Sequence, residues 1–451
     1  MEGSATMELL TAADAERRQR RAAAGLAAMG VEVGQAVAFV LPGSADLLCA
    51  VLGAARVGII PVLLNPGLTA GEAQAQLDLV NPALVVQDPN VLHRLFGAGD
   101  AELAPHPLTR PVHFTSGTTG AAKAVTTGIF DEATAASVVA DEAELWQLDG
   151  SDRFLMCSPM HHTVAIRFAV TALAAGAELL VTRHFEATDV LATLREARPT
   201  AAFMVPTHLQ RVLGLGELGT EERFDSLRYL VHAGSSCPPA LKRAAMAKVG
   251  GRGVVEFYGS TEAQFTYASQ EDWLEHRGTV GRARQGRVLS IDPGPDGGDV
   301  GTIWCTQPGF ARFAYLDDPV ATAKAWRGDA CSVGDLGELD ADGFLYLTGR
   351  RDDLVITGGV NVYPAEVEAA LAGTPGLVEL AVFGVDDDAW GQRVCCAVVG
   401  EEGVEAALRA VAADRLAPFK RPKSYYRCEA LPTTSTGKVL RRALPALFGL
   451  T

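Results

Sequence analysis

The chain has 451 residues, which predicts two or three folding units at roughly 150 residues per unit. Hydrophobic residues make up 48% and charged residues 21%, an ordinary globular composition that excludes a disordered or fibrous chain. The 39 Lys and Arg against 54 Asp and Glu give a net charge of −15, which disfavours general binding to nucleic acid or to anionic membranes. A local basic site for an anionic small molecule is still compatible with this charge.

Cysteine spacing and the N-terminal residues indicate the compartment. The eight cysteines include no Cys-x-x-Cys pair and no zinc-ligand spacing, which favours reduced thiols. The N-terminal segment carries Asp14, Glu16 and arginines at 17, 18, 20 and 21 in place of the apolar core of a signal peptide. No apolar run approaches the ~20 residues of a membrane span, and Pro61 interrupts the longest candidate. We therefore predict a cytoplasmic protein without a membrane span.

Helix and strand patterns alternate along the first 285 residues or so. Thr11 begins a predicted helix that extends to about Met29, Ser44 caps a second helix up to Ala55, and Thr69 starts a third helical pattern. Short apolar runs predict strands at residues 37–41, 59–64, 83–87, 153–157, 178–181, 201–205, 229–232 and 253–257. Apolar strands that alternate with helices predict an α/β fold with a mainly parallel sheet.

The pattern changes after about residue 286, where glycine and aspartate become dense. Residues 302–306 and 343–348 predict short strands with tight turns, and hence a small β-rich subdomain. Polar density peaks at residues 349–353, and a predicted helix at 364–372 and strand at 380–383 follow. We therefore predict a large N-terminal domain, residues 1–351, and a small α+β domain, residues 352–451, with the boundary at Asp352.

A glycine- and threonine-rich segment that ends in a lysine is the strongest local signal. It reads Thr115-Ser116-Gly117-Thr118-Thr119-Gly120-Ala121-Ala122-Lys123. Its backbone N–H groups and hydroxyls suit the oxygens of a polyphosphate, and Lys123 supplies a positive charge. The spacing is not that of a Walker A loop, because the glycines are too close and no Ser or Thr follows Lys123. Taken alone, the segment is equally compatible with a polar surface turn.

Three further segments carry polar groups at predicted strand ends and loops. Tyr258-Gly259-Ser260-Thr261-Glu262 offers a ring that can stack on a base and a carboxylate that can hold Mg²⁺. Asp335, between glycines, suits two ribose hydroxyls. Lys438, on a small polar loop, can swing into a site. In isolation, each is more often a packed tyrosine, a turn aspartate or an exposed lysine.

The order of these segments along the chain is more specific than any one of them. The set, completed by Gly349-Arg350-Arg351-Asp352-Asp353, resembles the adenylate-forming superfamily of acyl-CoA synthetases, peptide-synthetase adenylation domains and luciferases. The resemblance covers nearly the whole chain from about residue 30. It implies a large N-terminal domain of stacked α/β subdomains and a mobile C-terminal lid, hinged at Asp352, that rotates between two half-reactions.

The resemblance also implies roles for single residues. Tyr258 would stack on adenine, Asp335 would bind ribose with Arg350 nearby, and Lys438 would contact the carboxylate and the α-phosphate during adenylation. The residues implied for ATP or AMP are Thr115, Ser116, Gly117, Thr118, Thr119, Gly120, Lys123, Gly234, Ser235, Tyr258, Gly259, Thr261, Asp335 and Arg350. The residues implied for Mg²⁺ are Glu262 and Thr118, and those implied for catalysis are Lys438, Glu262 and His162.

The sequence departs from the family pattern at two places. Ala122-Lys123-Ala124 stands where the family usually has Pro-Lys-Gly, a difference that bears on the mobility of the loop. Glu256 stands where Asn is common near the adenine amine, so we do not predict it as a contact.

The segment Pro159-Met160-His161-His162 resembles the acyl-CoA synthetase segment whose histidine gates or lines the acyl pocket. We therefore predict His162, with Ala233 and Gly234, at an acyl pocket; ordinary packing histidines are the alternative. Amino-acid adenylation domains carry an aspartate nearby for the substrate amine, and no Asp or Glu occurs between residues 156 and 177. Since a buried ammonium without a partner is costly, a plain carboxylic acid is favoured.

The C-terminal part favours CoA as the acceptor. Gly358 and Gly359 would let a pantetheine arm pass close to the backbone. Trp390 resembles the tryptophan that lines this arm, and Lys420 and Arg421 form a basic patch suited to CoA phosphates. Each feature also has an interpretation without a ligand. A basic patch, for example, is usually only a solvent-exposed surface.

These patterns predict an ATP-dependent acyl-CoA synthetase that uses ATP, Mg²⁺ and CoA on a small-molecule carboxylic acid. A stand-alone ligase that loads the phosphopantetheine thiol of an acyl carrier protein is the second interpretation. A nucleotide-binding homologue without catalysis is the third, and the presence of Lys438, Glu262 and Asp335 argues against it. The patterns predict neither the identity of the acid nor the oligomeric state.

Overall fold

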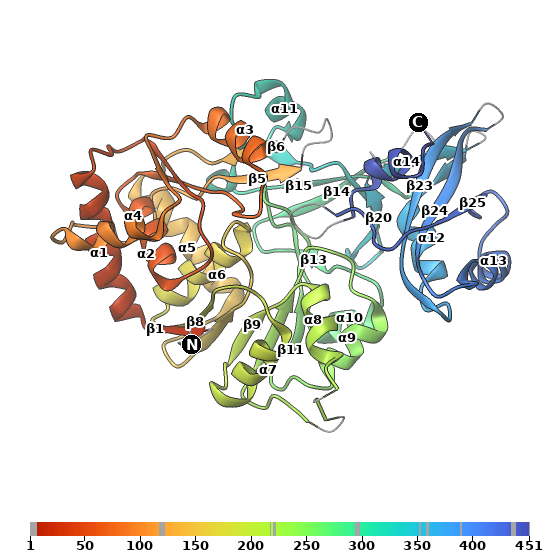
Figure 1. Cartoon of the computed structure of the whole chain (residues 1–451), viewed down its shortest axis with the longest axis horizontal. Helices are drawn as coiled ribbons and strands as arrows, with labels where there is room; N and C mark the ends of the chain where they lie inside the picture. The colour runs from red at the N-terminus through yellow and green to blue at the C-terminus, as the bar shows by residue number, and fades with distance from the viewer. Residues whose placement is uncertain are drawn as a thin grey trace. The chain divides into compact units, whose positions relative to one another are not determined.

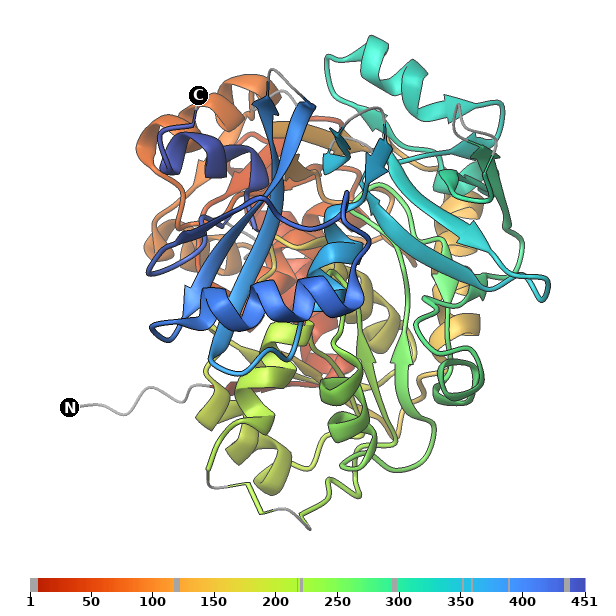
Figure 2. The ribbon, with the colours of Figure 1, turned by 90° about the vertical axis from the view of Figure 1, so that its right-hand side faces the viewer.

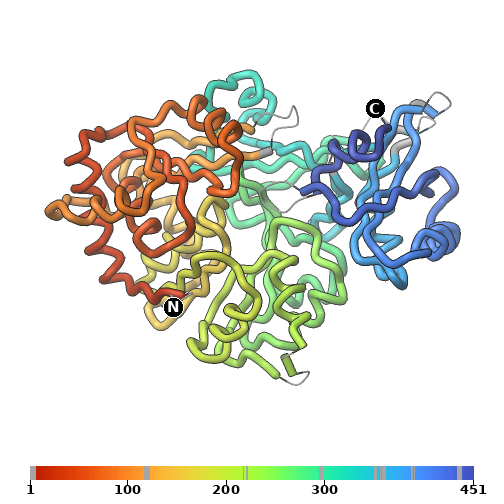
Figure 3. Tube along the Cα trace, viewed as in Figure 1, coloured from red at the N-terminus to blue at the C-terminus, as the bar shows by residue number. Residues whose placement is uncertain are grey.

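The computed structural model describes residues 7–116, 122–216, 218–219, 222–293, 298–350, 353–357, 360–387, 390–433 and 439–450. The chain divides into two compact units (Figures 1 and 3). Unit 1 comprises Met1–Val288 and Thr306–Cys331, and unit 2 comprises Leu289–Cys305 and Ser332–Thr451. The predicted hinge residue Asp352 lies outside the described residues, so the domain boundary at that residue stays a prediction.

A six-stranded sheet forms the centre of unit 1. Its order is β1-β8-β7-β9-β10-β11, and all neighbours are parallel except β1 with β8. The strands are β1 (Met7–Leu10), β7 (Arg153–Met156), β8 (Glu178–Thr182), β9 (Ala201–Phe203), β10 (Tyr229–His232) and β11 (Gly253–Glu256). Alternate side chains enter two apolar cores, since Phe154 belongs to one core and Leu155 to the other. The predicted α/β class is confirmed.

Helices cover both faces of this sheet, as expected for parallel strands (Figure 1). The helices α5 (Glu132–Trp146) and α6 (Thr163–Ala174) contribute apolar side chains to the first core. The second core receives side chains from α7 (Ala187–Glu196), α8 (Pro206–Leu213) and α9 (Pro239–Met246). The short helix α10 (Gln270–Glu275) lies beside β11.

A smaller parallel sheet, in the order β3-β2-β4, precedes the central one in the chain. Its strands are β2 (Ala36–Phe39), β3 (Ile60–Leu63) and β4 (Leu84–Val86). The accompanying helices are α1 (Ala12–Ala28), α2 (Ala45–Arg56), α3 (Ala70–Val80) and α4 (Pro89–Arg94). The hydroxyls of Thr11 and Ser44 accept hydrogen bonds from the N–H groups of Asp14 and Leu47, at 3.2 and 3.1 Å. The two predicted helix starts are therefore confirmed.

An antiparallel hairpin carries the predicted phosphate loop. Its strands are β5 (His113–Ser116) and β6 (Ala122–Thr126), and β6 also pairs with β16 (Ala314–Tyr315), which α11 (Pro319–Ala325) follows. The remaining strand pairs of unit 1 that the structure describes are β12 (Thr266–Tyr267) with β13 (Arg282–Ala283) and β17 (Trp326–Arg327) with β18 (Ala330–Cys331).

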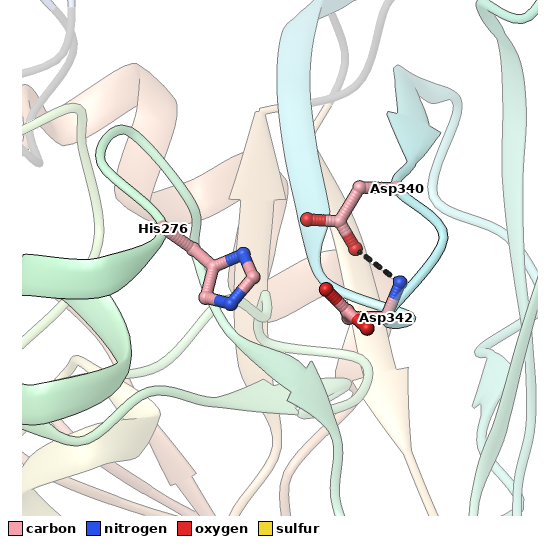
Figure 4. Close-up of side chains that lie close together, drawn as sticks. All are labelled: His276, Asp340 and Asp342. Carbon is pink, nitrogen blue, oxygen red and sulfur yellow. Dashed lines mark hydrogen bonds between the residues drawn. The ribbon is translucent and has the colours of Figure 1, made fainter.

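The first part of unit 2 is antiparallel. Its strands are β14 (Val288–Pro293), β15 (Gly301–Thr306), β19 (Asp335–Leu339) and β20 (Leu345–Arg350). The strand β19 pairs with both β15 and β20. In the turn after β19, the Asp340 carboxylate accepts a hydrogen bond from the backbone N–H of Asp342 at 3.0 Å (Figure 4). It accepts another from the backbone N–H of Phe344 at 2.9 Å. This confirms the predicted β-rich segment with tight turns.

The rest of unit 2 is a five-stranded sheet with its own helices (Figure 2). The strands are β21 (Val355–Thr357), β22 (Val360–Val362), β23 (Leu377–Asp387), β24 (Gly391–Gly400) and β25 (Ser424–Arg427). The helices are α12 (Pro364–Leu371), α13 (Val404–Arg415) and α14 (Leu444–Leu447). Val382, Val394 and Leu408 lie in its apolar core. Among the residues described in either unit, no helix is long and apolar enough to cross a membrane.

Candidate active site

The Tyr-Gly-Ser-Thr-Glu segment leaves β11 in a tight turn that buries Glu262. The Ser260 N–H donates to the Ala263 carbonyl at 2.8 Å, and a Cβ on Gly259 would lie 2.7 Å from that same oxygen. Glycine is therefore required at this position. The Glu262 side chain is only 9% exposed, and its Oε1 accepts a hydrogen bond from the Tyr315 hydroxyl at 2.9 Å. Its Oε2 accepts no hydrogen bond from any residue that the structure describes.

Tyr315 connects Glu262 to the predicted phosphate loop. It lies opposite Val125 in the β16–β6 pair, and β6 also carries Lys123. The Lys123 Nζ is 4.8 Å from the centroid of the Tyr315 ring and 4.0 Å from the Asp318 carboxylate. Burial, with the nearby Glu262 carboxylate, raises the pKa of Tyr315, so its hydroxyl keeps its proton and donates to Glu262. The phosphate-loop hairpin and the segment that carries Glu262, which are distant in the sequence, therefore both contact the Tyr315 side chain.

Only the base of the predicted phosphate loop is described. Thr115 lies opposite Lys123, and the Ser116 backbone lies opposite Ala122. The Ser116 side chain and Gly117, Thr118, Thr119 and Gly120 lie outside the described residues. Their predicted phosphate contacts, and the predicted Mg²⁺ contact of Thr118, therefore stay predictions.

Two segments with residues predicted for the nucleotide or the acyl pocket follow the carboxyl ends of neighbouring strands. Ala233-Gly234-Ser235 follows β10, and Tyr258 follows β11. Gly234 has a φ of +94°, a conformation that favours glycine. The Tyr258 ring is buried and packs edge-on against Phe265, with centroids 5.3 Å apart. Because β10 and β11 are parallel, both segments leave the sheet at the same edge.

A cavity in unit 1 borders the Glu262 turn. The space between its lining atoms is ≈ 870 Å³, a figure that includes open solvent. Its walls include Thr261 and Glu262, His113 of β5 and Thr163 of α6. The structure thus brings the predicted metal ligand and the first residue after His162 to one cavity.

Histidines gather at the start of α6. The ring of His162, the residue before this helix, lies 4.5 Å from the ring of His161, centroid to centroid. His113 Nδ1 is 3.1 Å from the Thr163 Oγ1, and its Nε2 is 3.3 Å from the Met160 carbonyl oxygen. Burial lowers the pKa of His113 to about 4 and that of His161 to about 3, so both are neutral at pH 7. The acyl-pocket role of His162, Ala233 and Gly234 stays a prediction.

In unit 2, Asp335 and Arg350 lie opposite one another in the β19–β20 register. Asp335 is 9% exposed, and the Arg350 side chain lies outside the described residues. The register thus brings together the two positions predicted for the ribose. Lys438, Gly358 and Gly359 also lie outside the described residues, and their roles stay predictions.

The residues predicted for CoA have contacts within unit 2. Trp390 is 53% exposed. Lys420 forms an ion pair with Glu366. The Arg421 side chain donates to the carbonyls of Leu416 and Ala413, at 2.8 and 2.9 Å. Both side chains thus contact other residues of unit 2. CoA binding by this patch stays a prediction.

A buried cluster of polar side chains, which the sequence did not predict, includes the last residues of β10 and β11. Lys242 Nζ of α9 is 2.6 Å from Glu256 Oε2 of β11 and 4.8 Å from the Trp273 ring centroid. His232 Nδ1 of β10 is 3.9 Å from Glu256 Oε1, and burial lowers the pKa of His232 to about 3. Glu256 is therefore held by Lys242.

A family model described as AMP-binding enzyme matches residues 5–315, well over half of the chain. The chain belongs to the AMP-binding enzyme family. A second model, for the C-terminal domain of AMP-binding enzymes, matches residues 366–438 of unit 2. The resemblance that the order of the motifs indicated is confirmed, and the two matches agree with a larger N-terminal and a smaller C-terminal part.

Known relatives of this AMP-binding enzyme span nearly all of it. Long-chain-fatty-acid–CoA ligase FadD13 of Mycobacterium tuberculosis is 29% identical over 98% of this chain and 94% of its own length. The 2-succinylbenzoate–CoA ligase of Geobacillus kaustophilus is 31% identical over 94% of this chain and 90% of its own. The solved structure of o-succinylbenzoate CoA synthetase (MenE) from Bacillus subtilis, in complex with its acyl-adenylate intermediate, has a TM-score of 0.85 and 27% identity and covers 96% of this chain and 92% of that one.

Proposed function

We propose that this AMP-binding enzyme is an acid–thiol ligase that consumes ATP. It converts a carboxylic acid to its acyl-AMP, releases pyrophosphate, and transfers the acyl group to the thiol of CoA. The observation that carries the proposal is the junction at Tyr315, which joins the phosphate-loop hairpin to Glu262. The relatives named above support it, since two are named as CoA ligases and the third was solved with an acyl-adenylate.

The chain provides a suitable donor for Mg²⁺. Glu262 presents a carboxylate whose Oε1 is held by Tyr315 and whose Oε2 accepts no hydrogen bond from a described residue. Mg²⁺ favours one or two carboxylate oxygens together with phosphate oxygens of a substrate. When bound, the ion supplies positive charge that offsets the charge of the phosphates.

The first half-reaction needs charge neutralisation more than proton transfer. A carboxylate is already a nucleophile at pH 7, so no general base is required, but it must approach a tetra-anionic nucleotide. Lys123 at the base of the loop and the predicted Lys438 supply positive charge, and the Tyr315 hydrogen bond fixes Glu262. One carboxylate oxygen bonds to the α-phosphorus, and the bond from that phosphorus to the pyrophosphate oxygen breaks.

In the second half-reaction, the thiol sulfur replaces AMP on the acyl carbon. The thiol loses its proton to solvent, its sulfur attacks the acyl carbon of the mixed anhydride, and AMP leaves with the oxygen that joined it to the acyl group. No residue is required to activate the acid a second time, because the anhydride has AMP as its leaving group.

A panel of carboxylic acids tests this proposal. We expect acid-dependent release of pyrophosphate from ATP and, when CoA is added, formation of an acyl-CoA and of AMP. Thioester formation only with the phosphopantetheine of a carrier protein would identify the carrier-protein ligase instead. No release with any acid, from folded protein with ATP and Mg²⁺, would contradict both enzyme functions.

A further inference from the structure

Arg110 lines the cavity beside Glu262 and is a partly buried cation without a close counter-ion. Its guanidinium makes no hydrogen bond and no ion pair within 4.0 Å with any residue that the structure describes. Its contact is the Phe130 ring, whose centroid is 5.9 Å from Cζ. Burial lowers the pKa of Arg110 to about 10. Because removing a charge from water without giving it a partner is costly, even in part, this position favours an anionic ligand.

The charges around Arg110 already pair with one another. Asp141 binds Arg284 and Arg287, each at 2.9 Å. Glu142 lies 3.2 Å from Arg284 and 3.7 Å from Arg167. The cations in this described cluster are Arg110, Arg167, Arg284 and Arg287, and the carboxylates acting on Arg110 are Glu142 and Asp141. Glu262 lines the same cavity, so four positive charges stand against three negative ones, an excess of one.

A hydroxyl without a partner lies in the same cavity. Thr127 Oγ1 is buried and has no hydrogen-bond partner among the described residues, and Thr127 lines the cavity with Arg110. Much of the remaining wall is apolar, for example Val139 of α5 and Ile166 and Val170 of α6. A carboxylate accepts hydrogen bonds from both a guanidinium and a hydroxyl, so one such group satisfies Arg110 and Thr127 together.

We propose that the acid activated by this enzyme carries a second carboxylate, which Arg110 and Thr127 bind in the cavity that Glu262 borders. This inference rests on the proposed function and assigns its substrate class. The substrate is a dicarboxylic acid whose carboxylates are joined by an apolar chain or ring. A fatty acid in the same place would leave the charge of Arg110 against alkyl carbons.

Matched acids test the inference. Each pair differs only in a methyl group or a carboxylate at the far end: pentanoate and glutarate, hexanoate and adipate, and 4-methylbenzoate and terephthalate. Pyrophosphate release gives kcat/KM for each acid. We expect the best diacid to exceed its partner by about 50-fold or more, since a site built for a polar group rejects the analogue that lacks it.

Three variants test which residues cause the preference for the diacid. Arg110→Met should lower kcat/KM for the diacid by about 100-fold, mainly through KM, and leave the monoacid within about threefold. Thr127→Val should lower kcat/KM for the diacid by about fivefold. Arg17→Met, whose side chain is 66% exposed on α1, is the matched control and should change neither acid.

The outcomes separate this inference from the proposed function. Preference for the monoacids in the wild-type enzyme, or an equal loss with both acids in Arg110→Met, overturns the inference and leaves the proposed function standing. If Arg110→Met does not fold, the wild-type acid pairs decide alone. No release with any acid overturns the proposed function and this inference with it.

Discussion

At the scale of single residues, Glu262 has the most defined place in the candidate site. Glu262→Gln keeps the shape of the side chain but removes the negative charge offered to Mg²⁺. We expect acid-dependent pyrophosphate release to fall by about 100-fold and to require more Mg²⁺, the scale for losing one preorganised electrostatic contact. Steady-state assays over a range of Mg²⁺ concentrations measure both effects.

Tyr315→Phe is the matched control for this prediction. It keeps the Glu262 carboxylate and removes the hydrogen bond of 2.9 Å that holds Oε1. We expect a loss of about tenfold or less, the scale of one hydrogen bond. Full activity of Glu262→Gln, or an equal loss in the two variants, would contradict the role assigned to Glu262.

Lys438 provides a prediction that separates the two half-reactions. Lys438→Ala should slow acyl-AMP formation by about 100-fold or more, because a positive charge at the α-phosphate is lost. Thiolysis of a supplied acyl-AMP should change much less, since CoA attacks the acyl carbon and not the phosphorus. Rapid-quench assays of each step, with Lys324→Ala on the exposed face of α11 as control, measure this. Equal slowing of both steps would count against this role.

The sequence indicated candidate site residues within contiguous motifs, but it did not indicate the side chains that contact them. Glu262, Tyr258 and Lys123 stand in segments whose residue types already indicate the chemistry. Tyr315 and Arg110 carry no such local signal, since their importance comes from contacts with other elements. Site residues that act through contacts between distant segments can be identified only once the fold is known.

At the scale of elements, the buried ion pair between Lys242 and Glu256 links α9 to β11. Lys242→Met leaves the Glu256 carboxylate buried without its partner, which should cost about 3–5 kcal/mol in the free energy of unfolding. The double variant Lys242→Met/Glu256→Gln removes both charges and should recover most of this loss. Urea unfolding of the three proteins measures the difference. A single variant as stable as the wild type would show that the pair is not needed.

The parallel strands of unit 1 were predicted to within one or two residues, because apolar runs end at Gly, Pro or polar turns. The predicted strand at residues 229–232 is β10 itself, and that at 59–64 contains β3. The pairing of β1 with β8 and of β16 with β6 was missed. These strands are short and pair with segments far along the chain, so no local periodicity marks them.

At the scale of the whole molecule, buried neutral histidines should make stability depend on pH. Burial lowers the pKa of His113 to about 4 and that of His232 to about 3. In the unfolded chain histidine titrates near pH 6.5, so below that pH the unfolded chain binds more protons. The stabilisation is complete above pH 6.5. It should fall by about 1.4 kcal/mol per pH unit for each histidine on acidification toward the folded pKa.

Urea unfolding at pH 7, 6 and 5 measures this dependence. His232→Leu should reduce the slope because one titrating group is gone. His93→Gln, at an exposed position on α4, should leave the slope unchanged. A free energy of unfolding that stays constant from pH 7 to pH 5 would contradict the buried neutral state of these histidines.

The proposed reaction begins with attack of a carboxylate oxygen on the α-phosphorus of ATP. Transfer of ¹⁸O from a carboxyl-labelled acid reports this step, with the products analysed by mass spectrometry after one turnover in the presence of CoA. We expect one ¹⁸O in AMP and none in pyrophosphate. Label in inorganic phosphate, with ADP as the other product, would show attack at the γ-phosphorus and would rule out the proposed reaction.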